Sequence, residues 1–285
     1  MRQRPARLAL LLAGSLVAVL LVPASAAAST RPPAGPSAVA ALPPPTPCPA
    51  PGCWHPAVQT SWQIQLSAKI DTNVAVQMFE IDMFDHEKDG MVGKLHAKGA
   101  KVLCYVSAGS WEDWRPDASS YPAVVKGNSN GWPGEKWVDI RRLDILGPIL
   151  EARMNRCDAA GFDGIDFDNV DGYTNTTGFP LTADDQLAFN TWLANEAHER
   201  GLAVALKNDL DQIPTLVPYF DMAVNEQCAQ YKECALLTPF VQAGKPVFQI
   251  EYSLTIPKFC PAANQMNFNA LKKKMSLNAY RVACR

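Results

Sequence analysis

The segment Gly164-Ile165-Asp166-Phe167-Asp168 alternates small or acidic residues with large apolar ones. Because successive side chains of a β-strand point to opposite faces, both aspartates lie on one face and both apolar residues on the other. The segments 202–207 and 246–251 repeat this alternation, and each ends in a charged residue, Lys207 or Glu251. The pattern predicts strands that turn an apolar face to covering helices and a small or polar face to a barrel lumen, with charged residues at the strands' carboxyl ends.

Eight candidate strands alternate with helical stretches along the chain. They are residues 62–66, 74–79, 101–107, 164–168, 202–207, 220–225, 246–251 and 277–282. Helices are predicted over 143–160, from apolar spacing, and over 182–201, where Thr182 and Asp185 form a capping pair. This alternation predicts an α/β fold, a single-domain (β/α)8 TIM barrel. A doubly wound open sheet is the alternative, but the first strand-to-helix turn has no glycine-rich phosphate loop.

The amino-terminal residues predict export from the cell. Three arginines precede an uncharged run over 8–22 and the small-residue sequence Ala24-Ser25-Ala26, which predicts a signal peptide over 1–26 and a secreted, extracellular protein. A membrane anchor is the alternative, but the run is short for a bilayer and no later stretch favours membrane insertion. Residues 27–53, rich in Pro, Ala and Ser, are predicted to be a disordered linker, and 54–285 the domain.

The charge and the cysteine content narrow the classes of partner and of cysteine site that the chain can have. The net charge of -2 gives no reason to expect nucleic acid, and the run Lys272-Lys273-Lys274 is interpreted as the solvated face of a helix. A monomer is expected. An even count of eight cysteines in an exported chain favours disulfides over a zinc site, which is the alternative. Local pairing is the simplest scheme: Cys48–Cys53, Cys228–Cys234 and Cys260–Cys284, leaving Cys104–Cys157.

Polar residues gather at the ends of the predicted strands, where barrel active sites form. They are Asp82, Tyr105, Trp111, Asp166, Asp168, Asp171, Lys207, Asp209, Asn225, Glu226 and Glu251. Carboxylates beside Tyr and Trp suit a sugar, and glycosidic bonds are cleaved by two carboxyl groups that flank them. Asp168 and Glu226 are predicted to be that catalytic pair, and the other residues to bind the polysaccharide substrate.

Several of these residues have other interpretations. Asp166 could raise a neighbour's pKa by like-charge repulsion, or it could pair with Lys207 and fill the lumen. Glu251 could bind a backbone amide, and Trp111 could anchor a loop. Glu226 could be tied to a loop held by Cys228–Cys234.

No metal and no cofactor are predicted. The segment beginning Asp166-x-Asp168 lacks the glycine and the final glutamate of an EF-hand, although an irregular site with Asp171 stays an alternative. No G-x-S-x-G sequence supports an α/β-hydrolase.

Seven sequence blocks resemble one family, the endo-α-1,4-polygalactosaminidases (glycoside hydrolase family 114), which are TIM-barrel enzymes. The blocks are 62–66, 104–112, 132–135, 166–173, 207–209, 225–228 and 251–252. The resemblance implies cleavage of internal α-1,4 linkages in galactosamine-containing exopolysaccharides of biofilms, with Asp168 and Glu226 as the carboxylate pair.

The implied polymer is cationic when deacetylated, and an acidic rim of Asp166, Asp171, Asp209 and Glu251 would attract it. One departure concerns Phe162, which stands where the family has a cysteine, so the Cys104–Cys157 pairing stays open. The alternatives to this function are a glycosidase for another α-galactoside and a barrel that binds polysaccharide without cleaving it.

Overall fold

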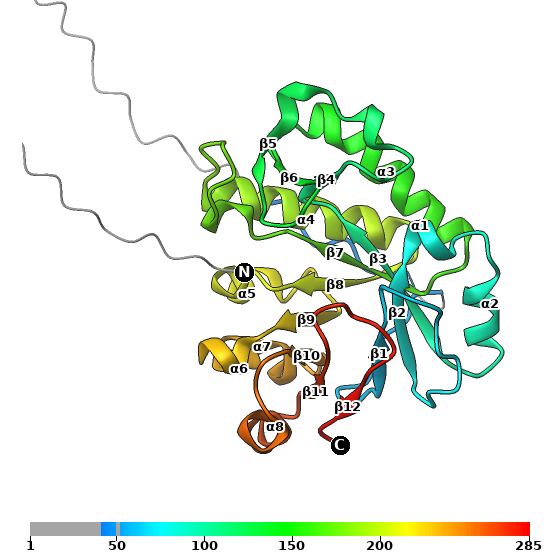
Figure 1. Cartoon of the computed structure of the whole chain (residues 1–285). Helices are drawn as coiled ribbons and strands as arrows, with labels where there is room; N and C mark the ends of the chain where they lie inside the picture. Colours follow the sequence, from blue (N-terminus) through cyan, green and yellow to red (C-terminus); the bar gives the residue numbers. More distant parts are fainter. Residues whose placement is uncertain (1–40, 50–51) are drawn as a thin grey trace, which may run out of the picture. The chain divides into compact units, whose positions relative to one another are not determined.

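A curled sheet organises the chain (Figure 1). The computed structural model describes residues 41–49 and 52–285, and within them the main sheet has nine strands. In sheet order they are β1 (Trp62–Ile64), β2 (Met78–Asp82), β3 (Lys101–Ser107), β7 (Gly164–Asp168), β8 (Ala203–Lys207), β9 (Met222–Glu226), β10 (Val247–Glu251), β11 (Asn269–Lys272) and β12 (Val282–Ala283). All neighbours pair in parallel except β11 and β12, which are antiparallel.

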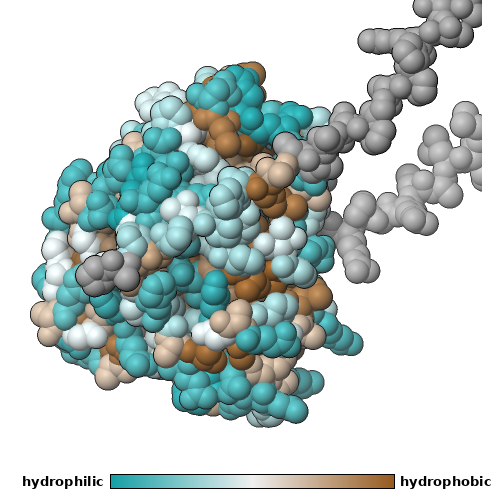
Figure 2. Space-filling model, turned by 180° about the vertical axis from the view of Figure 1, so that it is seen from behind, coloured by the Kyte–Doolittle hydropathy of each residue, from teal (hydrophilic) through white to brown (hydrophobic). Residues whose placement is uncertain are grey.

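Helices connect these strands and lie on the outer side of the curled sheet (Figure 1). They are α1 (Met83–His86), α2 (Met91–His96), α3 (Leu143–Ala159), α4 (Ala183–Glu199), α5 (Ile213–Leu216), α6 (Cys228–Tyr231), α7 (Thr238–Gln242) and α8 (Ile256–Gln265). Seen from behind, the surface is largely hydrophilic with scattered apolar patches (Figure 2). This agrees with helices that turn their apolar sides inward.

A second, antiparallel sheet is inserted between β3 and α3. Its strands are β4 (Ser110–Glu112), β5 (Lys126–Ser129) and β6 (Glu135–Val138), in the order β4-β6-β5. The alternation in the sequence did not predict this sheet, because its strands are short and lie outside the strand–helix repeat.

Two apolar clusters confirm the two-faced strands. Ile165 and Phe167 of β7 and Leu206 of β8 belong to the cluster beneath the helices. The lumen holds a separate cluster that includes Ala205 and Trp62. Asp166 and Asp168 therefore face the lumen, as the alternation predicted.

Strand β10 has the opposite orientation to the one predicted. Phe248 and Ile250 belong to the apolar cluster of the lumen, whereas Glu251 accepts a hydrogen bond from the backbone N of Ala229 on the helix side, at 2.8 Å. Ile250 is also in register with Glu226 on β9, so these two side chains share a face. Alternation separates two faces but does not say which one is inner, and here the bulky face fills the lumen.

The eighth strand was also predicted in the wrong place. The chain returns to the sheet as β11, whereas the segment 277–282 is irregular before β12, and Leu277 has a positive φ of 45° that a strand does not allow. The lysine run is not a solvated helix face: Lys272 ends β11, and Lys273 is 1% exposed. The Nζ of Lys273 donates to Gln63 Oε1 at 2.9 Å, which its long stem permits.

The carboxyl-terminal segment joins β1 and β11, the first and last parallel strands of the curled sheet. In the sheet of the described residues β1 and β11 are not direct neighbours. Leu66 N donates to Leu277 O at 2.9 Å, Arg281 Nε donates to Trp62 O at 2.8 Å, and β12 pairs with β11. These contacts supply the backbone partners that a direct β1–β11 pairing would otherwise provide.

Residues 42–49 of the predicted linker pack against the domain. Tyr219 OH donates to Pro43 O at 2.6 Å, and Thr46 N donates to Asn195 Oδ1 at 2.7 Å. The compact unit begins at Leu42. The predicted signal peptide lies outside the described residues.

The expected disulfide scheme is confirmed: Cys48–Cys53, Cys104–Cys157, Cys228–Cys234 and Cys260–Cys284 are bonded. Cys104 lies on β3 and Cys157 on α3. This disulfide, whose pairing the sequence left undecided, therefore joins a strand to a covering helix. Among the described residues no helix has the length and apolarity needed to cross a membrane.

The amino-terminal cap of α4 gives a stability test. Thr182 Oγ1 accepts from Asp185 N at 3.1 Å, and Asp185 Oδ2 accepts from Thr182 N at 2.8 Å, which is the predicted capping box. We expect Thr182→Ala to lower the free energy of unfolding by about 1 kcal/mol in urea titrations. Thr255→Ala is the matched control, since Thr255 caps α8 without a side-chain hydrogen bond. An equal loss in both variants would contradict the capping role.

Candidate active site

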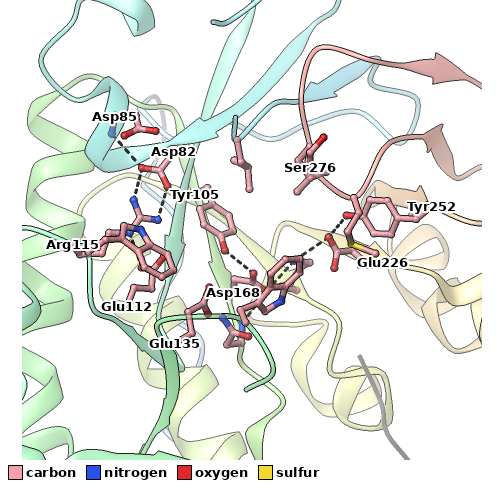
Figure 3. Close-up of a pocket in the computed structure, with 17 residues that line it drawn as sticks. Asp82, Asp85, Tyr105, Glu112, Arg115, Glu135, Asp168, Glu226, Tyr252 and Ser276 are labelled. Carbon is pink, nitrogen blue, oxygen red and sulfur yellow. Dashed lines mark hydrogen bonds and ion pairs between the residues drawn. The ribbon is translucent and has the colours of Figure 1, made fainter. Parts of the chain in front are cut away.

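A cleft of about 470 Å³ opens at the carboxyl ends of the parallel strands (Figure 3). Its floor is formed by residues at or near the carboxyl ends of β2, β3, β7, β8 and β9. They are Asp82, Tyr105, Asp168, Lys207 and Glu226. All five were predicted as site residues, and the curl of the sheet brings them together from widely separated parts of the chain.

Lys207 joins the two predicted catalytic carboxylates. Its Nζ donates to Asp168 Oδ1 at 2.9 Å and lies 3.8 Å from Glu226 Oε1. Burial opposes the charge of Lys207, but the carboxylates of Asp168, Glu226 and Asp166 raise its pKa well above the ordinary value. The lysine is therefore an ammonium that neutralises part of the negative charge at the floor of the cleft.

Asp168 is held in its ionised form. Burial alone would raise its pKa, but the charge of Lys207, with hydrogen bonds from Lys207, Tyr105 and Asn169 N, brings the pKa below its ordinary value. Tyr105 OH donates to Asp168 Oδ2 at 2.7 Å. A carboxylate in this state can act as a nucleophile or an electrostatic stabiliser.

Glu226 has a different environment. Tyr252 OH donates to its Oε1 at 2.5 Å, and its side chain is 26% exposed against 20% for Asp168. Burial, followed by the charge of Glu226, raises the pKa of Tyr252 above its ordinary range, so the phenol stays a donor. Two carboxyl groups whose neighbours differ can take different roles, one as the acid and the other as the base.

A buried acidic pair lies below this floor. Glu80 on β2 and Asp166 on β7 are both fully buried, and all four carboxyl oxygens lack an N–H or O–H donor among the described residues. Burial raises the pKa of Asp166 to about 7, and burial followed by Asp166 raises the pKa of Glu80 well above its usual range. A proton shared between the two carboxyls supplies the missing donor.

Backbone turns aim the site residues. Asn169, Asn208 and Gln227 each follow the end of a strand and have positive φ values of 62°, 53° and 68°. Asn208 Oδ1 accepts from Glu226 N at 3.0 Å, so the turn after β8 fixes the end of β9. Left-handed asparagine is uncommon and marks positions where the surrounding structure imposes the conformation.

One wall of the cleft is a guanidinium clamp. Arg115 donates two hydrogen bonds to Asp82, at 2.9 and 2.7 Å, and its Nε donates to Glu112 at 2.8 Å. Asp82 is thus tied to the inserted sheet through a charged pair (Figure 3). The bidentate geometry makes this contact directional as well as strong.

Several predicted binding residues lie elsewhere. Asp166 lies beneath the floor, Glu251 binds the Ala229 amide and Asn225 Oδ1 accepts from Cys228 N at 3.1 Å, both on the helix side. Asp209 is 2% exposed and accepts from Asn190 at 2.8 Å. The rim expected from Asp166, Asp171, Asp209 and Glu251 is therefore not the lining of this cleft.

Trp111 and Asp171 also lie outside the cleft lining. Trp111 Nε1 donates to Ala118 O at 3.0 Å, which is the loop-anchor alternative, and its ring borders a shallow hollow outside the main cleft. Asp171 precedes the turn Gly172–Thr174 and its carbonyl accepts from Thr174 Oγ1 at 3.0 Å.

Five further residues at or below the cleft were not predicted from the sequence: Glu80, Arg115, Glu135, Trp114 and Trp132. Glu135 and Trp132 line the cleft from the inserted sheet and its turn. The only sequence signal for these two was the resemblance of the block 132–135, since periodicity says nothing about an insertion. Glu80 lies on β2, which begins at Met78 and not at the predicted residue 74. On this strand Glu80 has an inward-facing position in the alternation.

Two groups of potential metal ligands occur among the described residues. They are Cys48, His198 and Asp221, and Cys228, Cys234 and Glu251. Their cysteines are disulfide-bonded, so no thiolate is available there.

Comparisons with known proteins agree with this geometry. The model of glycoside-hydrolase family GH114 matches residues 44–285. The crystal structure of Aspergillus fumigatus Ega3 in complex with galactosamine is similar at 40% identity and a TM-score of 0.76, covering 81% of this chain and 97% of that one.

Two further relatives are more distant. The glycoside hydrolase domain of PelA from Pseudomonas aeruginosa has 15% identity and a TM-score of 0.62, covering 78% of this chain and 98% of that one, a likeness of fold alone. An uncharacterised protein of Deinococcus radiodurans is 27% identical over 276 residues, covering 84% of this chain and 88% of that protein.

Gly109 gives a test of how the floor is positioned. A Cβ at this residue would lie 1.7 Å from Asn169 O, and Gly109 N donates to Asp168 O at 3.1 Å. We expect Gly109→Ala to displace the end of β7 and to lower the free energy of unfolding by about 1–3 kcal/mol. Gly93→Ala, in α2 with open space around it, is the control and should be neutral or stabilising. Wild-type stability of the Gly109 variant in urea would refute the close approach.

The buried acid pair predicts a pH dependence of stability. The native state keeps a proton on Asp166 up to a pKa of about 7, whereas the unfolded chain releases it near pH 4. Between these values the native state binds more protons at this site, so its contribution to stability falls as pH rises. We expect Asp166→Asn to gain stability relative to wild type between about pH 5 and about pH 7.5.

Urea unfolding at the two pH values measures this gain. Asp184→Asn, an exposed acid of α4, is the control for the loss of one negative charge. A stability difference between wild type and Asp166→Asn that does not change with pH would argue against a shared proton.

Proposed function

This chain belongs to glycoside-hydrolase family GH114 and is a glycoside hydrolase; we propose that it cleaves internal α-1,4 linkages of galactosamine-containing exopolysaccharide, as in biofilms. One observation carries the proposal: Asp168 and Glu226 meet the same ammonium, Lys207, in an open cleft. The likeness to Ega3, which was crystallised with galactosamine, supports the choice of sugar.

The unlike environments of the two carboxylates support distinct roles. Asp168, held ionised by Lys207 and Tyr105, is suited to attack the anomeric carbon. Glu226, more exposed and farther from Lys207, is suited to protonate the leaving glycosidic oxygen. Tyr252 OH donates to Oε1, and Oε2 accepts no hydrogen bond from the described residues, so Oε2 would carry that proton.

The reaction would proceed in two steps. As Asp168 bonds to the anomeric carbon, the glycosidic bond breaks and the proton of Glu226 passes to the departing sugar oxygen. Glu226, now a carboxylate, then removes a proton from the water that releases the glycosyl group from Asp168. We propose this retaining course, in which the two carboxyl groups are about 5 Å apart.

We also propose an overall architecture and an extracellular location for the protein. Eight parallel strands in sequential order support a (β/α)8 barrel whose last gap is filled by the carboxyl-terminal segment. Four disulfides support an oxidising, extracellular setting, with residues 1–26 as the signal peptide and 27–53 as a linker whose last part, from Leu42, packs against the domain. We expect a monomer.

Product analysis tests the activity. The mature protein is incubated with partly deacetylated α-1,4-polygalactosamine, and mass spectrometry should find short galactosamine-containing oligomers. We expect Asp168→Asn and Glu226→Gln to lower turnover by about 10²–10⁴-fold or more, since each removes a group that acts in the transition state.

The control for this experiment is Asp211→Asn, which removes an exposed carboxylate outside the cleft. Near-normal turnover by either active-site variant would reject the assignment of that residue. A folded wild-type protein that gives no oligomers would favour another α-galactoside or a non-catalytic binding role.

A further inference from the structure

The inserted sheet brings a carboxylate into the cleft that the barrel strands do not supply. Glu135 is the first residue of β6 and lines the cleft together with Asp168. Figure 3 shows it beside Asp168, on the side of the cleft opposite Glu226 and Tyr252. A sugar unit next to the reacting bond would therefore pass close to Glu135.

The hydrogen bonds of Glu135 both fall on one of its two carboxylate oxygens. Ser110 Oγ donates to its Oε2 at 3.0 Å and Asn130 Nδ2 donates to the same oxygen at 2.6 Å. Both donors are neutral and hold the side chain in one orientation. Oε1 has no hydrogen-bond partner within residues 41–49 and 52–285.

Glu135 also differs from the other acids of the cleft in its charge balance. Asp82 and Glu112 are paired with Arg115, and Asp168 and Glu226 with Lys207. Glu135 is half-buried and forms no ion pair in the described part of the chain, and Asp85, the remaining acid of the lining, is exposed.

The electrostatic environment makes a bound cation favourable at this position. Burial raises the pKa of Glu135, its two hydrogen bonds lower it, the negative charge of Asp168 raises it and the positive charge of Arg115 lowers it, and the net shift is upward. A carboxylate that is costly to ionise in the free protein is stabilised when a positive group arrives beside it. The preorganised Oε1 therefore has the properties of a receptor for an ammonium group.

We propose that Glu135 binds the ammonium group of a galactosamine unit through Oε1 and thereby selects deacetylated over N-acetylated polymer. The proposal rests on the proposed function, because it assigns a specificity residue to that same cleft. An N-acetyl group has no positive charge and presents a bulkier, neutral amide, so it gains nothing from this carboxylate.

Two tryptophans complete the recognition surface. Trp132 and Trp114 line the cleft and are 47% and 52% exposed, and Trp132 O accepts a hydrogen bond from Glu135 N at 3.1 Å. An indole face attracts a cation, and the Arg115 guanidinium lies over the Trp114 ring at 5.9 Å from its centroid, whereas the exposed Trp132 offers a flat surface for a sugar ring and its ammonium. The turn that positions Glu135 thus also positions Trp132.

The decisive variant is Glu135→Gln, which keeps the shape and the oxygen that accepts from Ser110 and Asn130 but removes the charge. Rates are measured on two α-1,4-linked galactosamine oligomers, one fully deacetylated and one N-acetylated. We expect kcat/KM on the deacetylated oligomer to fall about tenfold or more, mainly through KM, and to change less than about threefold on the acetylated one.

Asp113→Asn is the matched control, since Asp113 is an exposed acid of the same insertion that borders the outer hollow and not the cleft. It should leave both rates near wild type. Thermal unfolding of both variants verifies that the fold is retained.

The possible results distinguish the role of Glu135 from the glycosidase activity itself. Equal losses on both oligomers, or no loss on either, would overturn the role of Glu135 while leaving the glycosidase intact. If the wild type cleaves neither oligomer, the proposed function fails, and calorimetric binding of the two oligomers decides the ammonium site alone. Tighter binding of the deacetylated oligomer that is lost in Glu135→Gln supports the site, and equal binding rejects it.

Discussion

The contact of one buried ammonium with two carboxylates underlies the rest of this structure. Lys207 is 3% exposed, and without Asp168 and Glu226 its charge would be too costly to bury. Conversely, three acids gather at this point of the lumen, and Lys207 is the cation that lets them remain close. The charges of Lys207, Asp168 and Glu226 thus determine both the proposed catalytic geometry and the stability of the lumen. Substitution of any one of them should therefore affect both.

The lumen is arranged in layers along the strands. An apolar layer that includes Trp62 and Phe248 lies deepest, the protonated pair of Glu80 and Asp166 lies above it, and the floor of the cleft follows. An acid pair that shares a proton lies between the apolar layer and the charged floor. It holds a proton close to the proposed catalytic carboxylates without adding the full charge of two more ions.

Chemistry and recognition come from different parts of the chain. In the proposed mechanism the strands of the main sheet supply the reacting carboxylates, and the three-stranded insertion supplies the wall, where Arg115 clamps Asp82 and Glu135 lines the cleft. Residues on rigid strands keep the precise geometry that bond cleavage needs. An insertion at the rim can change without disturbing that geometry, which suits it to the choice of substrate.

The sequence by itself determined the alternation of strands and helices, the cap of α4 and the acids that end β7 and β9. These features depend on local periodicity and on residues near one another in the chain. The tertiary structure alone decided that β10 turns its bulky side inward, that the lysine run ends a strand, and that Glu135 joins Asp168 in the cleft. Alternation distinguishes two faces without saying which is inside, and contacts made across the barrel leave no periodic trace in the sequence.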